Sequence, residues 1–422
     1  MEKLLHYVWK HKIFPLNELR TMSGQVLEVI DTGLANPHAG PDFFNAKIKL
    51  DGVLWIGNIE LHQQSSDWYR HHHDTNPAYN SVILHIASCI DTEVIRNNGE
   101  PVPQLKLECP AYVCTNYEEL LTTDSYPPCY RIIPTLSPLM IHSWMSSLQT
   151  ERLEQKTIQV ENRLSSCNHN WEDVFFITLA RNFGFGVNSE TFEYWAKRIP
   201  LRAVDKHRDN LFQIEALFFG QAGILEDPDG DEYYLRLKKE YRYLAHKFNL
   251  TPMDTSLWRF LRLRPYNFPH VRIAQLAFLY HRSTRLLSQL MEKESLKDVR
   301  ELLRVGTSEY WLTHYAFGRK SSLRTKILSD SSLDLLIINT VVTFLYAYGR
   351  HRANELLCTR ALSFLEVLKP ENNYIIRLWE QCSLKAVHAG DSQALIQLKK
   401  EYCDKKKCLY CRFGYEYLRL KK

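Results

Sequence analysis

The chain has 422 residues, which is long enough for two or three domains of about 150 residues each. With 45% hydrophobic and 24% charged residues, and only 16 Gly and 17 Pro, the composition excludes disordered and fibrous classes. The net charge of +5 is unevenly divided, because residues 1–125 hold 9 Lys and Arg against 16 Asp and Glu. We therefore expect an acidic front domain and a basic back domain with different roles.

The first 130 residues have the pattern of a mixed α and β domain. Leu4, Leu5, Val8 and Trp9 share one helical face. Strand patterns follow at residues 25–31, 43–50, 54–61 and 81–87, with the hairpin signal Asp51-Gly52 between the second and the third. Proline-rich segments then place the end of this domain near residue 130.

The remainder, residues 131–422, changes to a helical period and shows no convincing strand. Helices are predicted from residue 144 onward and at residues 171–183, 189–197, 208–219, 232–248, 272–293, 333–348, 353–368 and 392–403. The predicted fold class is thus α+β, with a front α/β domain over residues 1–130 and a mainly helical, basic domain over residues 131–422.

Membrane and secretion signals are not recognisable in the sequence. The longest nearly apolar run, residues 333–348, is interrupted by Asp334 and Asn339 and is shorter than the roughly 18–20 residues that span a bilayer. The first residues have no apolar core or cleavage site of a signal peptide, so the ten cysteines indicate a reducing compartment. We expect a cytoplasmic protein without a membrane partner, in which residues 333–348 form a buried helix.

Two carboxylates and a base gather in the predicted sheet. Glu60 and His62 are two apart on one strand and therefore share a face, and Asp42 opens the preceding strand across the hairpin. Such a set suits Mg²⁺ or Mn²⁺, which prefer oxygen ligands and activate water against a phosphodiester. The alternative is a turn aspartate and a solvated strand face.

This order of elements resembles the core of the PD-(D/E)XK nucleases: helix, strand, a strand opened by Pro41-Asp42, a strand with an acid-x-base triplet, then helix and strand. The resemblance implies that Asp42 and Glu60 hold the metal and that His62 stands where the signature has lysine. His62 titrates near neutrality whereas lysine keeps its charge, which puts the activity in doubt. The whole chain is also similar to an uncharacterised bacterial family, through GPDFFNA, GNIELHQQSSDW, VILHI and LRPYNFPHVRIAQLA.

Other histidines lie close to this set in the sequence. His71, His72 and His73 are consecutive, so they diverge and rarely all bind one ion, although one of them with His62 or His85 would complete a site. His85 lies in the apolar run VILHI, and we expect a hydrogen-bonded core histidine there; the alternative is a ring that faces Glu60.

Cysteines near the C-terminus form a second candidate metal site. Cys403, Cys408 and Cys411 have C-x4-C-x2-C spacing, which fits three ligands of an iron–sulfur cluster or of a zinc site. Cys382 is the nearest candidate for a fourth ligand, with Cys358 or Cys129 as alternatives. The competing interpretation is a set of packed or exposed thiols.

The back domain has the composition of a nucleic-acid partner. Residues 236–304 hold 15 Lys and Arg against 6 Asp and Glu, interleaved with aromatic residues. Arg259, Arg262, Arg264 and Arg272 are the candidate phosphate contacts, although charged helical faces are often only solvated.

No P-loop, dinucleotide fingerprint or GxSxG elbow is present in the sequence. This excludes nucleotide-driven enzymes and serine hydrolases as leading hypotheses.

Three hypotheses for the function follow from the sequence. The first is a metal-dependent nuclease, in which His62 orients or deprotonates the attacking water. The second is a catalytically degenerate nuclease-like module that binds nucleic acid or a protein partner. The third is a metal-dependent hydrolase of a small substrate.

Overall fold

The computed structural model describes residues 2–15 and 19–421, and the chain folds into two compact units. Unit 1 comprises Met1–Ser137, Cys382–Leu384 and Leu398–Lys422, and unit 2 comprises Pro138–Gln381 and Lys385–Gln397. The predicted boundary at residue 130 lies just before the end of the first segment of unit 1. The cysteine-rich C-terminal segment, assigned from the sequence to the helical domain, instead folds with unit 1.

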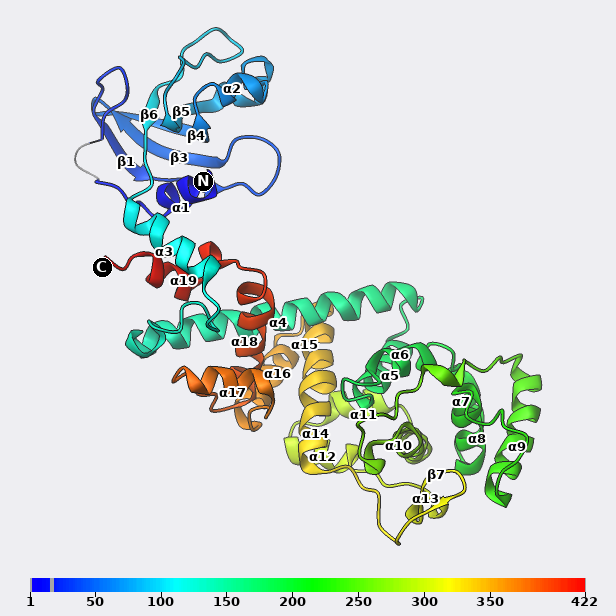
Figure 1. Cartoon of the computed structure of the whole chain (residues 1–422). Helices are drawn as coiled ribbons and strands as arrows, with labels where there is room; N and C mark the ends of the chain where they lie inside the picture. The colour runs from blue at the N-terminus through cyan, green and yellow to red at the C-terminus, as the bar shows by residue number, and fades with distance from the viewer. Residues whose placement is uncertain (1, 16–18, 422) are drawn as a thin grey trace. The chain divides into compact units, whose positions relative to one another are not determined.

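Unit 1 contains a mixed sheet with the strand order β1-β3-β4-β5-β6, and a short strand β2 that pairs with β3 (Figure 1). The strands are β1 (Leu27–Asp31), β2 (Leu34–Ala35), β3 (Phe43–Leu50), β4 (Val53–Gln64), β5 (Val82–Cys89) and β6 (Gln104–Lys106). The pairs β1-β3 and β3-β4 are antiparallel, whereas β4-β5 and β5-β6 are parallel. The α+β class is confirmed, and all four predicted strands are present.

Local sequence explains these strands. Asp51 and Gly52 have φ values of 49° and 82°, so they form the predicted tight turn between β3 and β4. The run VILHIA is buried along β5 because that strand lies between β4 and β6. Helix α1 (Glu2–Lys10) buries its apolar stripe and contacts β4. The connection from β4 to β5 consists of α2 (Asp67–Arg70), η1 (His73–Thr75) and η2 (Pro77–Ser81).

The rest of unit 1 joins segments that are distant in the sequence. Helix α3 (Ala111–Thr122) packs against α19 (Arg412–Leu418). The Asn116 side-chain amide donates to the carbonyl groups of Tyr417, Leu418 and Leu420 at 3.2, 3.4 and 2.9 Å. Short helices η3 (Ile133–Thr135), η7 (Leu398–Cys403) and η8 (Cys408–Tyr410) complete the unit.

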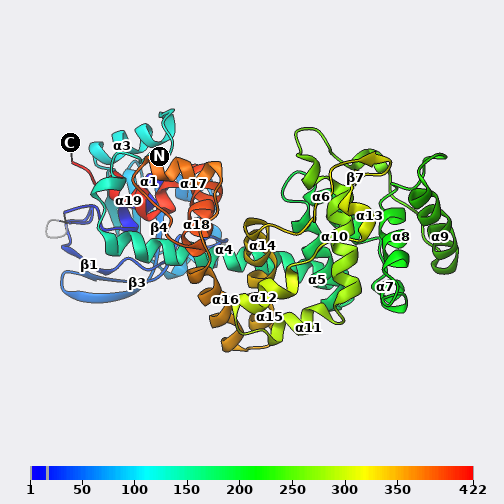
Figure 2. The ribbon, with the colours of Figure 1, turned by 90° about the horizontal axis from the view of Figure 1, so that it is seen from below.

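Unit 2 is helical, and α8 packs between α9 and α10 (Figure 2). Its α-helices are α4 (Pro138–Ser166), α5 (Trp171–Phe183), α6 (Ser189–Ala196), α7 (Leu201–Lys206), α8 (Leu211–Gln221), α9 (Glu232–Phe248), α10 (Pro269–Arg282), α11 (Leu286–Glu292), α12 (Leu296–Leu303), α13 (Glu309–Leu312), α14 (Asp330–Leu336), α15 (Val342–His351), α16 (Glu355–Val367), α17 (Tyr374–Gln381) and α18 (Ala389–Gln397). Shorter helices are η4 (Thr255–Leu257), η5 (Pro265–Asn267) and the π-helix η6 (Ile337–Val341). The expectation of no strand is wrong, because β7 (His314–Ala316) and β8 (Arg319–Lys320) form a small hairpin.

The apolar run of unit 2 lies in a continuous helix, α14-η6-α15, that spans Asp330–His351. By length and composition alone this helix could cross a membrane. However, 72% of its most apolar window is buried inside the fold, as in a core helix. The predicted buried helix is confirmed and is longer than its apolar run, while a cytoplasmic location stays a prediction.

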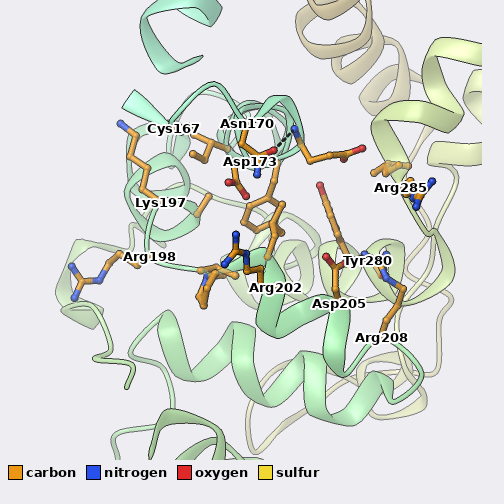
Figure 3. A pocket seen from close by; sticks show the side chains of 18 of the residues that line it. Cys167, Asn170, Asp173, Lys197, Arg198, Arg202, Asp205, Arg208, Tyr280 and Arg285 are labelled. Atoms are coloured by element: carbon orange, nitrogen blue, oxygen red, sulfur yellow. Dashed lines mark hydrogen bonds and ion pairs between the residues drawn. The ribbon is translucent and has the colours of Figure 1, made fainter. Parts of the chain in front are cut away.

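A cavity of 1310 Å³ opens between helices of unit 2 (Figure 3). Its lining carries both signs of charge, and several of its cations already have partners. Arg208 binds Asp205 and the backbone carbonyl of Tyr280, and Lys197 lies 2.9 Å from Glu193. These two cations are therefore already paired within the fold.

Candidate metal centre

Asp42 and Glu60 are brought together by the β3-β4 hairpin. The backbone N–H of Asp42 donates to Glu60 Oε2 at 3.0 Å, and the backbone N–H of Leu61 donates to Asp42 Oδ2 at the same distance. Glu60 and His62 lie on β4 with exposed fractions of 5% and 1%. The structure therefore places the three predicted site residues in one cluster, in which Glu60 and His62 are buried and Asp42 is half-buried.

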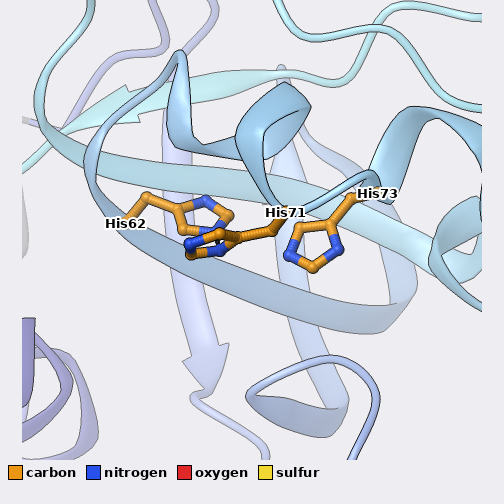
Figure 4. Close-up of side chains that lie close together, drawn as sticks. All are labelled: His62, His71 and His73. Carbon is orange, nitrogen blue, oxygen red and sulfur yellow. Dashed lines mark hydrogen bonds between the residues drawn. The ribbon is translucent and has the colours of Figure 1, made fainter.

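Two of the three consecutive histidines join this cluster. His72 has a φ of 60°, a left-handed conformation that turns the chain after α2. His71 and His73 consequently face His62, as Figure 4 shows, and His72 is not part of this group; His73 is buried, whereas His71 and His72 are exposed. The ligand atoms of His62, His71 and His73 all lie within 4.8 Å of one another. Within residues 2–15 and 19–421, this histidine trio is the one group of three such side chains that could hold a metal ion.

Glu60 supplies a fourth ligand atom to the trio. Its Oε1 lies 3.1 Å from His73 Nε2 and 3.6 Å from His62 Nε2, and His62 Nε2 lies 3.2 Å from His71 Nδ1. A tetrahedron with metal–ligand bonds of about 2.0–2.1 Å has edges of about 3.3 Å. Three of the six atom pairs in this set therefore have roughly the spacing of tetrahedral edges, while the group whose atoms all lie within 4.8 Å of one another comprises the three histidines without Glu60.

A buried second layer orients the ligands. His85 Nε2 lies 2.8 Å from His62 Nδ1, so His85 is the expected hydrogen-bonded core histidine, and its partner is His62. The ring of Tyr79 stacks on His73 with centroids 3.8 Å apart. Trp68 meets His73 and His85 edge-on and donates its indole N–H to the Ile95 carbonyl. Such outer partners fix the ring orientation and tautomer of metal-binding histidines.

Burial sets the protonation of the cluster. Burial, with Asp42 nearby, raises the pKa of Glu60 to about 9, and burial also raises the pKa of Asp42. Burial and the neighbouring His85 lower the pKa of His62 to about 2. At neutral pH the imidazole of His62 is therefore neutral and able to bind a metal, and a cation would favour ionisation of the two carboxyl groups.

Some residues around the site carry no sequence signal. His6 on α1 places its Nε2 3.4 Å from Asp42 Oδ2, although it is 36 positions away in the sequence. Trp68 and Tyr79 read in the sequence as ordinary apolar positions of a connection. Only the packing of the connection over β4 shows that they support the histidines.

The C-terminal cysteines lie in unit 1. In the sequence they are far from the elements that carry the histidines. Cys403 ends η7, Cys408 begins η8 and Cys411 precedes α19. Of the alternatives for a fourth ligand, Cys358 lies on α16 of unit 2, and Cys129 is buried in unit 1.

Of the four predicted phosphate contacts, three are exposed and one is buried. Arg259, Arg262 and Arg264 are exposed on the irregular segment between η4 and η5. Arg272 is only 3% exposed, lies over the ring of Phe185 at 4.4 Å and donates to Gln275. Its assignment to a nucleic-acid surface is corrected, because the guanidinium group packs inside unit 2.

Comparison with curated proteins and with solved structures found no match. The model of a protein family described as "Protein of unknown function (DUF2851)" matches residues 2–374. This range includes the whole sheet of unit 1 and the histidine cluster. Because the match covers most of the sequence, the chain belongs to the DUF2851 family.

Proposed function

We propose that this protein is a metal-dependent hydrolase with a metal centre formed by Glu60, His62, His71 and His73. The observation that carries the proposal is the convergence of His62, His71 and His73, whose ligand atoms all lie within 4.8 Å of one another, with Glu60 Oε1 at 3.1 Å from His73 and 3.6 Å from His62. The cluster also has a buried second layer, and second layers of this kind support metal centres.

The ligand set indicates which metal the site takes. Three imidazole groups and one carboxylate favour a transition metal such as Zn²⁺ or Mn²⁺, whereas Mg²⁺ prefers an octahedron of oxygen atoms. When bound, such an ion supplies Lewis-acid chemistry and lowers the pKa of a coordinated water molecule. The expected metal therefore differs from the Mg²⁺ that two carboxylates alone would favour.

The geometry also changes the role proposed for His62. Both of its ring nitrogens have neighbours, His85 on one side and the ligand cluster on the other, and its pKa is lowered to about 2. We assign it to the metal shell rather than to general-base catalysis. Asp42 takes the role of proton acceptor, because its carboxylate borders the cluster, is fixed by the Leu61 N–H and has a raised pKa.

Phosphodiester bonds of nucleic acid are the proposed substrate. Supporting this choice are an acid before β3, an acid-x-base triplet on β4 and a crossover to the parallel strand β5, an order that resembles the PD-(D/E)XK nuclease core. His71 is exposed, so the cluster is reachable from solvent on that side. The exposed arginines of the segment 259–264 offer phosphate contacts.

A second candidate is hydrolysis of a small substrate. The observation that favours it is the histidine-rich ligand set, which differs from the two carboxylates and lysine of the resembled nucleases. The third hypothesis is a degenerate module that only binds nucleic acid or a protein partner. The experiment below distinguishes it from the two hydrolase hypotheses.

The test compares wild type with His73→Ala and with the matched control His72→Ala. Mn²⁺ binding is measured by calorimetry, followed by incubation with labelled single- and double-stranded DNA and RNA and with a small aryl phosphodiester. We expect one Mn²⁺ site in wild type and His72→Ala, an affinity at least about 100-fold lower in His73→Ala, and cleavage that follows binding. Equal Mn²⁺ affinity in all three proteins would overturn the metal centre. Binding without turnover on any substrate would select the degenerate module.

A further inference from the structure

The segment around Cys403, Cys408 and Cys411 is a compact turn held by its own backbone. The N–H of Lys406 donates to the Cys403 carbonyl at 3.1 Å, and that of Lys407 donates to the Tyr402 carbonyl at 2.8 Å. The N–H of Cys411 then donates to the Cys408 carbonyl at 3.3 Å. These bonds fold three cysteines back on one another, and Cys408 and Cys411 are buried.

The chain that follows α3 packs against this turn and brings a fourth cysteine. The Lys406 ammonium donates to the Leu121 carbonyl at 2.8 Å, and the Lys399 ammonium lies 4.5 Å from the centre of the Tyr126 ring. The Tyr126 side chain lies close enough to the Cys403 thiol to influence its protonation. Cys129 follows three residues later and is 6% exposed.

The Cys129 thiol lies within electrostatic reach of the other three. The thiols of Cys411, Cys403 and Cys408 each interact electrostatically with that of Cys129, which lies on the segment that the Lys406–Leu121 hydrogen bond holds against the turn. The same proximity links Cys403 to Cys411 and Cys408. All four thiols are free of disulfides.

We propose that Cys129, Cys403, Cys408 and Cys411 bind one metal centre through their four sulfur atoms. Four is the number of cysteines that holds a structural zinc ion or an iron–sulfur cluster, and the C-x4-C-x2-C spacing suits either. The alternatives for the fourth ligand fit less well. Cys358 belongs to unit 2, and Cys382, although it lies in unit 1 with its sulfur 4.0 Å from the Tyr126 carbonyl, shows no electrostatic interaction with another cysteine of the described residues.

Such a centre would fasten the C-terminal segment of unit 1 to the segment that follows α3. This role is independent of the histidine cluster and of the hydrolase proposal. Within residues 2–15 and 19–421, no three of the four cysteine sulfur atoms all lie within 4.8 Å of one another. A zinc ion would draw the sulfur atoms to about 2.3 Å from itself, whereas a polynuclear cluster accommodates wider spacing.

The test measures metal in full-length protein purified without oxygen. Zinc, iron and acid-labile sulfide are counted in wild type, Cys129→Ser and Cys408→Ser, with Cys382→Ser as the matched control and His73→Ala to exclude the histidine cluster. Apart from any metal that His73→Ala loses, we expect either one zinc per chain, or iron with equimolar sulfide and a thiolate-to-iron absorption band. Cys129→Ser and Cys408→Ser should lose this content, while Cys382→Ser and His73→Ala should keep it.

A measurement on wild type decides the question even where a serine variant does not fold. Four thiols should resist a thiol reagent until a chelator removes the metal, and should then react together. The proposal would be overturned if wild type contained neither zinc nor iron. It would also be overturned if folded Cys129→Ser kept the full metal content of wild type.

Discussion

Glu60 makes the stability of the metal-free protein depend on pH in an unusual direction. Its pKa rises from 4.5 to about 9 on folding, because burial and Asp42 disfavour the carboxylate. Between these values the folded chain holds a proton that the unfolded chain has released, so stability falls as pH rises. His62, with its pKa lowered from 6.5 to about 2, acts oppositely but only below about pH 6.5.

We therefore expect the free energy of unfolding to decrease from pH 6.5 to 9, by up to about 1.4 kcal/mol per pH unit for this proton. Urea unfolding in the presence of a chelator measures it. Glu60→Gln should flatten the profile, whereas the exposed Glu28→Gln should leave it unchanged. Identical slopes in wild type and Glu60→Gln would show that Glu60 ionises normally in the fold.

His85 tests whether the second layer supports the ligands. Its Nε2 lies 2.8 Å from His62 Nδ1, and the residue is fully buried, so His85→Phe removes this partner while largely keeping the volume. Loss of a second-layer partner lowers metal affinity by about 10- to 100-fold. We expect Mn²⁺ affinity to fall by that factor with the stoichiometry unchanged in calorimetry. Unaltered affinity in a folded variant would mean that His62 needs no orienting partner.

The sequence predicts part of this site and misses the rest for a definable reason. Alternation along β4 and the hairpin turn are local, and they suffice to bring Asp42, Glu60 and His62 together. The pairing of His71 with His73 depends on one backbone angle, the φ of 60° at His72. A histidine has no sequence signature for that conformation, so the ligand trio becomes visible only in the structure.

At the scale of elements, Gly57 sets the distance between β4 and β5. A Cβ atom at this position would lie 2.3 Å from Ile83 Cγ2 and 2.8 Å from the Ser81 carbonyl oxygen. Gly57→Ala should therefore push β5 away from β4 and destabilise the protein by about 1–3 kcal/mol. Gly306→Ala is the control, because its added Cβ would meet only Ile327 Cγ1 at 3.9 Å. Urea denaturation compares the two, and equal midpoints would contradict tight packing at Gly57.

Element length explains which strands and helices were predictable. The strands β1, β3, β4 and β5 are long enough to show alternation or a continuous apolar run, whereas β2 and β6 have two and three residues. The helix expected over residues 272–293 ends instead at Arg282, and α11 starts at Leu286. Arg285 between them has a φ of 51°, which interrupts an otherwise helical pattern.

At the scale of the whole molecule, the sequence predicts the domain boundary near residue 130. It does not predict that the C-terminal residues 398–422 fold with the N-terminal unit. Composition and prolines change near residue 130, close to the end of the first segment of unit 1 at Ser137. The return of residues 398–422 to unit 1 depends on long-range bonds such as those from Asn116 to the carbonyl groups of α19 and beyond. Periodicity carries no information about such pairing, so the sequence alone could not choose among the candidates for a fourth cysteine ligand.

The exposed arginines of the segment 259–264 allow the nucleic-acid part of the proposal to be tested apart from catalysis. If Arg259, Arg262 and Arg264 neutralise phosphates, each contact adds about 0.9 to the salt dependence of binding to duplex DNA. Replacing all three by alanine should lower the slope of log K against log salt by about 2–3, as measured by fluorescence anisotropy in a Glu60→Gln background, which is expected to prevent cleavage. A matched triple variant at the exposed Arg350, Arg352 and Lys385 removes the same charge elsewhere on unit 2. Because the net charge then changes equally, a smaller slope in the first variant alone would locate the phosphate contacts, and equal slopes in both would assign the binding to general charge.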